Sequence, residues 1–511
     1  MQRSHQDPTP VPTGPDQSER PETPTAPQYP GFLTVFPSLT LPMFLAIVDQ
    51  TIVATALPAI AASTGAVERA SWIVVGYLIA ATVAAPIYGR LGDAFGRRRL
   101  MFVALALFMV ASLCCAVAPT IELLTLARVL QGLGGGGLMT LSQALIGEAI
   151  PPRERARYQG YIATVAVIAN SFGPVAGGYL TQHFGWRSIF LINIPIGLAG
   201  VALVTRLPAF TPNPEHRWRA DPYGLLLFSV AVAAILLALE QAQSVDLKTL
   251  PSVVSLFVLG LIAAALLIRQ ENRAQSPLIP IGLIRMPAIW RSDAMAALHG
   301  GTLVSLITFL PVYLIVVRGQ SPAETGLLLV PLTIGVGTGS MVTGRLVSRT
   351  GRTTLFPTFG LGILTCSLIV LALWAPTLSN YAFAGLLLWT GLFLGTVMGV
   401  VQVVVQSASG PQRLGEAAAS VQFSRSIGAA FGTALVAFAL FAFLSFTDPQ
   451  AAHVFGLMVE RTAGAEAALH GPHGAILQAE ITGAFRAAFL LIASFTATNF
   501  VLAISHPWRR I

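Results

Sequence analysis

Long apolar runs alternate with short polar turns over almost the whole chain from residue 31 to residue 510. A helix of about 20 apolar residues crosses the hydrocarbon core of a bilayer, and the runs match that length. We therefore predict an all-α polytopic membrane protein with fourteen membrane-crossing helices. The predicted spans are 33–60, 70–88, 100–118, 123–147, 157–181, 188–206, 222–240, 250–268, 289–316, 325–347, 354–374, 380–407, 416–444 and 484–505.

Composition and charge placement add an orientation to this pattern. Only 10% of the residues are charged, whereas a soluble protein carries about a quarter. With the N-terminus inside the cell, 22 of the 30 basic residues fall in inner loops, in the tails or at the inner ends of spans, and five fall in outer loops. Loops rich in Arg and Lys stay in the cytoplasm, so we expect both termini there. No basic face with interleaved aromatic residues is present, which argues against a nucleic-acid partner.

Two unrelated motifs recur at a spacing of 255 residues. The turn Gly89–Arg99 has an imperfect copy in Gly344–Arg352, and the segment Gly173–Gly177 corresponds to Gly428–Gly432. Two motifs that repeat at one spacing predict a duplicated bundle, as in transporters that consist of two halves.

The same spacing maps the first span onto the ninth and so predicts the domains. Each half contains six helices, in residues 31–207 and 273–511, and residues 208–272 form two accessory transmembrane helices between them. Residues 1–30 hold eight prolines among polar residues, and we expect a disordered cytoplasmic tail. Residues 445–483 are expected to form a long outer loop.

Asp49 is the first candidate for the site, because it lies deep in the first predicted span. An ionisable group in hydrocarbon costs several kcal/mol, so Asp49 should face a cavity or a partner. A buried carboxylate is also a candidate for reversible protonation. An aspartate that only holds neighbouring helices together is the alternative.

Arg128 is the natural counterpart of Asp49, and Gln131 shares its helix face three residues later. An arginine keeps its proton, so Arg128 would act as a fixed positive charge. A structural arginine that reaches water is the alternative. Glu240, at the end of the first accessory helix, is a further proton-coupling candidate, although an interfacial glutamate is more often merely solvated.

The basic turn between the second and third spans contains Gly89, Asp93, Gly96, Arg97 and Arg98. The glycines permit a tight backbone. Asp93 is expected to pair with the two arginines or to cap the following helix. We interpret the turn as a conformational latch, since orientation by positive charge alone needs neither the aspartate nor the glycines.

The fifth span contains Gly173, Pro174 and Gly177, whereas the second copy keeps the glycines Gly428 and Gly432 but lacks the proline. Close helix packing explains both copies, and a hinge explains why only one has a proline. Both interpretations stay open from the sequence.

Polar and aromatic side chains inside the spans are candidates for a substrate cavity, because large apolar or cationic compounds need both kinds. Simple packing explains each of them equally well. The candidates are Trp72, Tyr77, Gln131, Gln143, Asn170, Phe172, His299, Phe309, Tyr313, Gln402, Gln406 and Phe423.

The sequence contains no catalytic motif. A phosphate-binding loop with Lys-Ser/Thr, a His-Glu-x-x-His pair and a nucleophile elbow are all missing, so we expect no enzyme and no ATP drive. Cys114, Cys115 and Cys366 lie in apolar runs without metal-type spacing, so we expect no metal and no bound cofactor.

These motifs resemble those of the major facilitator superfamily. The turn Gly89–Arg99 resembles its signature between helices two and three, and Leu124–Gly134 resembles the helix-four signature. Gly173–Gly178 resembles the helix-five signature associated with antiporters. The stretch Asp49–Pro58, together with the fourteen spans, is similar to the drug:proton antiporter branch with fourteen helices. Ala54 departs from this branch, in which many members carry Asn.

The resemblance implies twelve core helices around a central cavity, two accessory helices, and alternating access coupled to inward proton flow. Asp49 and Arg128 then take the coupling roles, and Asp93, Arg97 and Arg98 form the latch. The expected function is proton-coupled efflux of amphipathic or cationic compounds across a bacterial inner membrane.

Several alternatives fit the same fold. An exporter of lipids or of a specific endogenous metabolite or antibiotic is the main one. A facilitator without proton coupling and a membrane sensor that no longer transports are the others. A periplasmic adaptor is a conceivable partner if export has to cross two membranes.

Overall fold

The computed structural model describes residues 32–64, 69–207, 221–242, 250–274, 278, 281–447, 455 and 474–510. The predicted tail, residues 1–30, and most of the predicted outer loop, residues 445–483, lie outside the described residues. All the regular structure in the described part is helical apart from one isolated bridge between Arg352 and Arg510.

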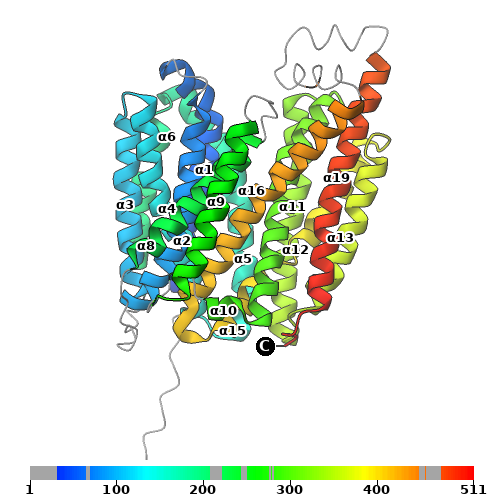
Figure 1. Ribbon diagram of the computed structural model, residues 1–511. Helices are drawn as coiled ribbons and strands as arrows, with labels where there is room; N and C mark the ends of the chain where they lie inside the picture. The colour runs from blue at the N-terminus through cyan, green and yellow to red at the C-terminus, as the bar shows by residue number, and fades with distance from the viewer. Residues whose placement is uncertain are drawn as a thin grey trace, which may run out of the picture.

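The first half begins with five long helices and ends with two short ones (Figure 1). They are α1 (Phe32–Thr64), α2 (Ser71–Phe95), α3 (Arg97–Val117), α4 (Ile121–Ala149), α5 (Pro152–Phe184), α6 (Ser188–Leu191) and α7 (Asn193–Val204). Two further long helices, α8 (Pro222–Ala242) and α9 (Leu250–Glu271), pack against each other and precede the short α10 (Ile281–Ile284).

The second half also combines long helices with one pair of shorter ones, but here the pair, α14 and α15, lies in the middle and two long helices follow it. Its helices are α11 (Pro287–Val316), α12 (Pro322–Thr350), α13 (Leu355–Trp374), α14 (Asn380–Leu394), α15 (Met398–Ser409), the 3-10 turn η2 (Pro411–Arg413), α16 (Leu414–Thr447) and α19 (Gly474–Ile504). Every predicted span coincides with one helix or with two consecutive short helices.

Local sequence explains where several helices begin and end. The Thr120 hydroxyl accepts a hydrogen bond from the Leu123 backbone N–H and caps α4, and Ser321 forms a capping box with Glu324 at α12. Gly96 separates α2 from α3 with φ 94°, a conformation that residues with a Cβ rarely adopt.

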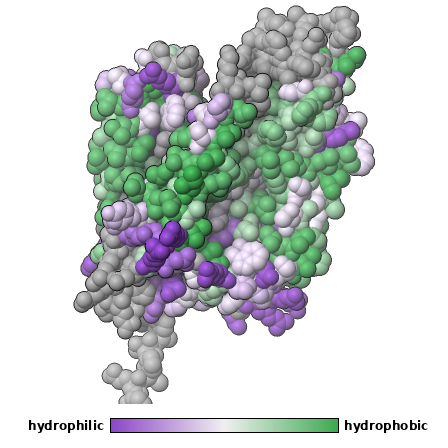
Figure 2. All heavy atoms as spheres, viewed as in Figure 1, coloured by the Kyte–Doolittle hydropathy of each residue, from purple (hydrophilic) through white to green (hydrophobic). Residues whose placement is uncertain are grey.

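Twelve helical segments among the described residues are long and apolar enough to cross a membrane. Helix α4 is not one of them, because its charged residues and four consecutive glycines lower its hydropathy. The segment Ser188–Val204 is apolar but shorter. Figure 2 shows hydrophobic side chains over the middle of the visible face, with hydrophilic ones gathered toward the end where the C-terminus lies. The protein is therefore a multi-pass membrane protein.

The repeated glycines hold equivalent pairs of helices together. A Cβ on Gly177 of α5 would lie 2.6 Å from the Ile52 carbonyl oxygen of α1, and one on Gly432 of α16 would lie 2.5 Å from Gly301 Cα of α11. Helix α5 runs on through Pro174 without interruption. The geometry favours the packing interpretation of this motif over the hinge.

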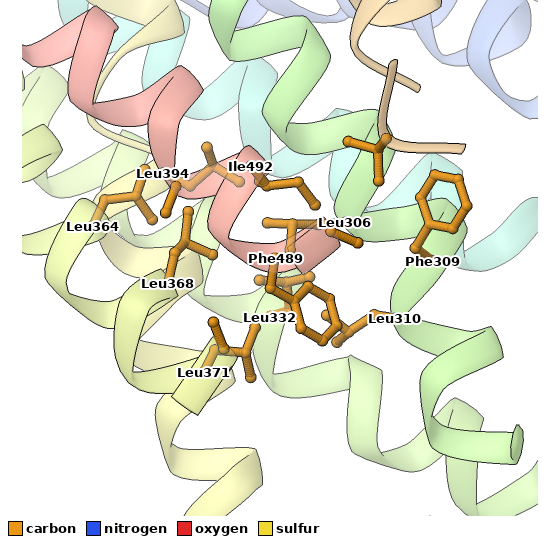
Figure 3. Close-up of a cluster of buried hydrophobic side chains, with 14 of the residues drawn as sticks. Leu306, Phe309, Leu310, Leu332, Leu364, Leu368, Leu371, Leu394, Phe489 and Ile492 are labelled. Atoms are coloured by element: carbon orange, nitrogen blue, oxygen red, sulfur yellow. The ribbon is translucent and has the colours of Figure 1, made fainter. Parts of the chain in front are cut away.

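The second half has a continuous apolar core between α11, α12, α13, α14 and α19 (Figure 3). Leu306 and Leu310 of α11 contribute to it together with Leu364 and Leu368 of α13 and Phe489 of α19. Two separate clusters form the core of the first half.

The segment after α19 is anchored against α11. The buried ring of His506 lies 3.1 Å from both Ser292 Oγ and the Ala288 carbonyl oxygen, and its Nδ1 accepts a hydrogen bond from the Trp508 backbone N–H. Burial lowers the pKa of His506 below its usual value.

The two halves meet at one end of the molecule, which we call the Asp93 end. There the helix pairs α2 and α16, and α5 and α12, pack together, and a Cβ on Gly160 would lie 2.8 Å from Met341 Cα. Toward the opposite end, Val175 of α5 and Leu327 of α12 are 74% and 73% exposed. The helices diverge in the same direction in Figure 1. The structure is thus closed between the halves at the Asp93 end.

Candidate transport site and latch

Asp49 and Arg128 form a buried ion pair inside the first half. Asp49 lies on α1 and Arg128 on α4, and Arg128 Nη1 lies 2.5 Å from Asp49 Oδ2. Their exposed fractions are 0% and 1%. Helices α1 and α4 pack against each other, which brings together two residues 79 positions apart in the sequence.

The Asp49 carboxylate receives two further hydrogen bonds, both from amide side chains. Gln131 Nε2 donates to Asp49 Oδ1 at 2.9 Å, and Asn193 Nδ2 donates to the same oxygen at 2.8 Å. Gln131 and Asn193 also donate to Ser112 Oγ, at 2.7 and 3.3 Å. Helices α4 and α7 thereby bind the Asp49 carboxylate of α1 directly, and α3 is joined to them through Ser112.

The Arg128 guanidinium is held equally closely. Its Nη1 donates to Gln131 Oε1 at 2.7 Å and its Nε to the Ile73 carbonyl oxygen at 3.3 Å. Its Cζ lies 4.2 Å from the centroid of the Tyr77 ring, within cation–π range. Removing one member of a buried ion pair costs about 3–5 kcal/mol, so a change in the charge of Asp49 must be felt by Arg128.

Sequence reasoning missed two members of this network, Asn193 and Ser112. Asn193 is a polar residue inside the apolar segment Ser188–Val204, and the rule that singles out Asp49 also applies to it. Ser112 carries no such signal, because a serine in a membrane helix is routinely satisfied by its own backbone. Here its hydroxyl donates to the Phe108 carbonyl oxygen.

The turn after α2 links the two halves through Asp93. Its Oδ1 accepts a hydrogen bond from the Gly415 backbone N–H at 2.9 Å, and its Oδ2 accepts one from the Glu416 N–H at 3.1 Å. Both N–H groups belong to the first turn of α16, where a carboxylate is favoured by unpaired donors and by the helix dipole. Asp93 therefore caps a helix of the other half and not the helix that follows it.

Two arginines of the first half, one before and one after Asp93 in the sequence, complete this contact. Arg97 Nη2 lies 2.6 Å from Asp93 Oδ1, and Arg97 Nη1 lies 3.1 Å from Glu148 Oε2 of α4. Arg90 of α2 forms an ion pair with Glu416 of α16. We call the set Arg90, Asp93, Arg97 and Glu416 the latch.

Arg98 differs from its expected role. Its Nε and Nη2 donate to the carbonyl oxygens of Val204 and Thr205, at 3.2 and 2.7 Å. The pairing of Arg98 with Asp93 that we expected is therefore wrong. These carbonyl groups lie at the C-terminal end of α7. The last carbonyl groups of a helix have no partner within the helix and accept hydrogen bonds from side chains such as arginine.

Glycines allow the backbones to approach at the latch. A Cβ on Gly89 would lie 2.6 Å from the Gly415 carbonyl oxygen and 2.8 Å from Ala419 Cβ. Helices α2 and α16 can touch here only without a side chain at position 89.

Three glutamines join the halves near the latch. Gln159 Nε2 donates to Gln143 Oε1 at 2.7 Å, and Gln406 Nε2 of α15 donates to the Gln143 carbonyl oxygen at 2.8 Å. Gln143 and Gln406 were sequence candidates, and they lie together. Gln159, on α5, was not.

The other cavity candidates are scattered. Phe309 and Tyr313 belong to the apolar core of the second half, where Tyr313 packs on Phe485 and Phe489, so their expected cavity role has no support. Buried side chains are found at His299 and Gln402, and exposed ones at Trp72, Asn170 and Phe172. Phe423 packs on Phe228 of α8, and Glu240 is exposed on α8, outside the Asp49 network.

Among the described residues, no group of three or more His, Cys, Asp or Glu side chains is arranged to hold a metal ion. The three cysteines are free thiols.

Comparison with known proteins identifies the family. A family model described as Major Facilitator Superfamily matches residues 39–433. An uncharacterized MFS-type transporter of Mycobacterium tuberculosis is 33% identical over 404 residues, and the match covers 78% of this chain but only 58% of that protein. The multidrug transporter protein MdtP of Bacillus subtilis is 28% identical over 403 residues, which cover 78% of this chain and 73% of MdtP.

The fold has a counterpart among solved structures. The human organic anion transporter MFSD10 superposes with a TM-score of 0.65 at 15% identity, over 93% of this chain and 100% of that structure. The helical architecture and the matched family model define a multi-pass membrane protein. The chain belongs to the Major Facilitator Superfamily, whose members need no bound cofactor.

Proposed function

We propose that this protein is a proton-coupled exporter of amphipathic or cationic compounds that works by alternating access. The observation that carries the proposal is the fully buried Asp49–Arg128 ion pair, with Gln131 and Asn193 bound to the same carboxylate. Ionisable residues inside membrane helices are expensive and mark proton relays and substrate pathways.

Protonation of Asp49 is the proposed coupling step. A proton on this carboxylate removes the counter-charge of Arg128 inside a site that excludes water. Breaking a buried ion pair costs about 3–5 kcal/mol, and this cost shifts the equilibrium by as much as one conformation accommodates the unpaired Arg128 better than the other. One proton on Asp49 is therefore able to change which conformation the first half prefers, through the helices tied to it.

The latch provides the second conformational element. We propose that the Asp93 end is cytoplasmic, so that the structure represents a state closed toward the cytoplasm. Release of Asp93 from the first turn of α16 would let α2 and α16 separate and open the Asp93 end to the cytoplasm. Gly89 is needed for reclosure, because only a glycine permits the approach to Gly415.

We further propose that α4 and the pair α6 and α7 also cross the membrane, which gives fourteen spans. Arg128 faces its partners inside the bundle, so a helix of lower hydropathy need not expose charge to lipid. Residues 31–207 and 273–511 are then the two six-helix halves, and 208–272 carry the accessory pair. The termini are cytoplasmic, and the membrane is a bacterial inner membrane.

The substrate class is proposed from relatives and from the site. MdtP is named as a multidrug transporter, which supports export of varied compounds. In the proposed exchange, a proton binds to Asp49 as the substrate leaves, while the charge of Arg128 stays fixed. Lipids or one endogenous metabolite are the alternative cargo, and a periplasmic adaptor becomes a partner only if two membranes have to be crossed.

The test is ethidium transport by the full-length protein in liposomes, with and without an imposed pH gradient, for wild type and Asp49→Asn. The proposal expects transport that depends on the gradient and is lost in the variant. Transport that ignores the gradient would leave a facilitator. No transport of ethidium under any gradient would contradict multidrug efflux and favour lipid or metabolite export.

A further inference from the structure

A second buried carboxylate, Asp293, lies outside the Asp49 network and is not among the site residues predicted from the sequence. It is the seventh residue of α11, about 9 Å along the axis from the start of this helix at the Asp93 end. Only 8% of the residue is exposed.

Asp293 has little internal compensation for its charge. Ser420 Oγ lies 3.3 Å from Asp293 Oδ1, but the same hydroxyl lies 3.1 Å from the Ala417 carbonyl oxygen. One hydroxyl has one proton, so the two oxygens compete for it. No basic side chain of the described residues forms an ion pair with Asp293, and the neighbouring Arg291 lies over the Trp290 ring, 5.0 Å from its centroid.

Asp293 opens into a cavity of about 190 Å³ between the two halves. Trp290 of α11 and Phe423 of α16 supply aromatic walls, and Pro86 of α2 closes the cavity from the first half. Glu416 also lines it. One Glu416 oxygen is paired with Arg90, and the other, Oε2, is buried without a hydrogen-bond partner among the described residues.

These features describe a receptor for a cation. Two carboxylate groups face one space, only one of them has a basic partner, and two aromatic side chains line the same space. Aromatic faces and carboxylates together attract organic cations, most strongly where water is excluded. The volume is below the 300–1,000 Å³ of a site for a whole drug-sized ligand, so it suits one cationic head group with a ring.

We propose that this cavity is a binding subsite for monovalent organic cations, with Asp293 as the anionic anchor and Phe423 and Trp290 as its walls. The inference rests on the proposed function and adds to it a place where a cationic substrate binds at the Asp93 end. Because Pro86 belongs to α2 and Glu416 to the latch, the subsite exists in this form only while the latch is closed. Binding and latch opening are therefore coupled.

The test uses benzyltrimethylammonium, a compact aromatic cation, titrated calorimetrically into the full-length protein in phosphatidylcholine nanodiscs. We expect Asp293→Asn to weaken binding at least tenfold and Asp293→Glu to retain most of it. The matched control is Glu122→Gln, which removes an acidic side chain that is paired with Arg69 on the surface of the opposite end. This control should bind like wild type.

A second measurement keeps Asp293 intact. In a protein whose three native cysteines are replaced, Ser424→Cys places a thiol in the lining of the cavity. Benzyltrimethylammonium should slow its alkylation. Equal binding by wild type and Asp293→Asn, or an alkylation rate that the cation does not change, would overturn the subsite.

The outcomes separate this subsite from the proposed function. Ethidium transport that follows the pH gradient, without Asp293-dependent binding of benzyltrimethylammonium, would remove the subsite and leave the exporter. Asp293-dependent binding without gradient-driven transport would leave the subsite and remove the proton-coupled exporter.

Discussion

Replacing Asp93 by Asn should open the protein at the Asp93 end. The Asp93 carboxylate accepts one backbone N–H on each oxygen, at 2.9 and 3.1 Å, from the first turn of α16. An asparagine has only one acceptor oxygen and no charge. The variant thus loses at least one hydrogen bond to a charged group and the interaction of that charge with the helix terminus.

The structure sets the size of this effect. A hydrogen bond to a charged group contributes about 1.5–3 kcal/mol, and a charge at a helix terminus about 0.3–1 kcal/mol. The sum is about 2–4 kcal/mol in favour of separation, or a shift of roughly 30- to 700-fold in the ratio of closed to open molecules. Arg97 keeps Glu148 as a partner, so the variant should still fold.

The assay is the distribution of distances between spin labels on α5 and α12 near the Asp93 end, measured by pulsed electron resonance in a background without native cysteines. The closed population should dominate in wild type and fall sharply in Asp93→Asn. Arg98→Gln is the matched control, because Arg98 binds carbonyl groups of its own half. Identical distributions in wild type and Asp93→Asn would refute the latch.

Three further predictions follow from the packing. Arg128→Met alone should lower the free energy of unfolding by about 3–5 kcal/mol, whereas the double variant with Asp49→Asn should recover part of it in thermal unfolding. Gly177→Leu should destabilise the protein by about 1–3 kcal/mol or more, because no space exists between this position and α1. Gly178→Leu is the control and should be neutral, since a Cβ there meets nothing within 4 Å. Burial lowers the pKa of His506, so the neutral imidazole stabilises the fold above about pH 6.5, the usual pKa of histidine. The difference in melting temperature between wild type and His506→Asn should therefore shrink as the pH falls toward about 5. A difference that stays constant with pH would contradict this.

Much of the fold was predictable because the membrane restricts it. Backbone polar groups in hydrocarbon must be satisfied within the helix, so apolar length alone located the helices to within several residues. The 255-residue repeat predicted a duplicated bundle, and in the structure α5 packs on α1 as α16 packs on α11. The extension of α2 from residue 88 to Phe95 was not predictable from apolar length, because its last turns carry Arg90 and Asp93, which contact α16 of the other half. Residues 474–483, which were expected in the outer loop, belong to α19.

The site was predictable only where a charge had to be explained. Asp49 and Arg128 were paired from their cost in hydrocarbon, and the structure places them together. The partners Asn193, Glu416 and Gln159 come from distant segments, and nothing in a single sequence states which helices become neighbours. Tyr313 was a cavity candidate, but it lies in the apolar core of the second half. The sequence could not separate the two locations, because an aromatic side chain with a hydroxyl fits a core as well as a cavity.

Proton movement driven by substrate alone is a direct test of the proposed role of Asp49 in coupling. An ethidium gradient is imposed across liposomes that contain the protein and an internal pH indicator, with no initial pH gradient. Ethidium flux should move protons in the opposite direction in wild type, and Asp49→Asn should abolish this movement. Ethidium flux without proton movement in wild type, or unchanged proton movement in Asp49→Asn, would contradict the proposed role of Asp49.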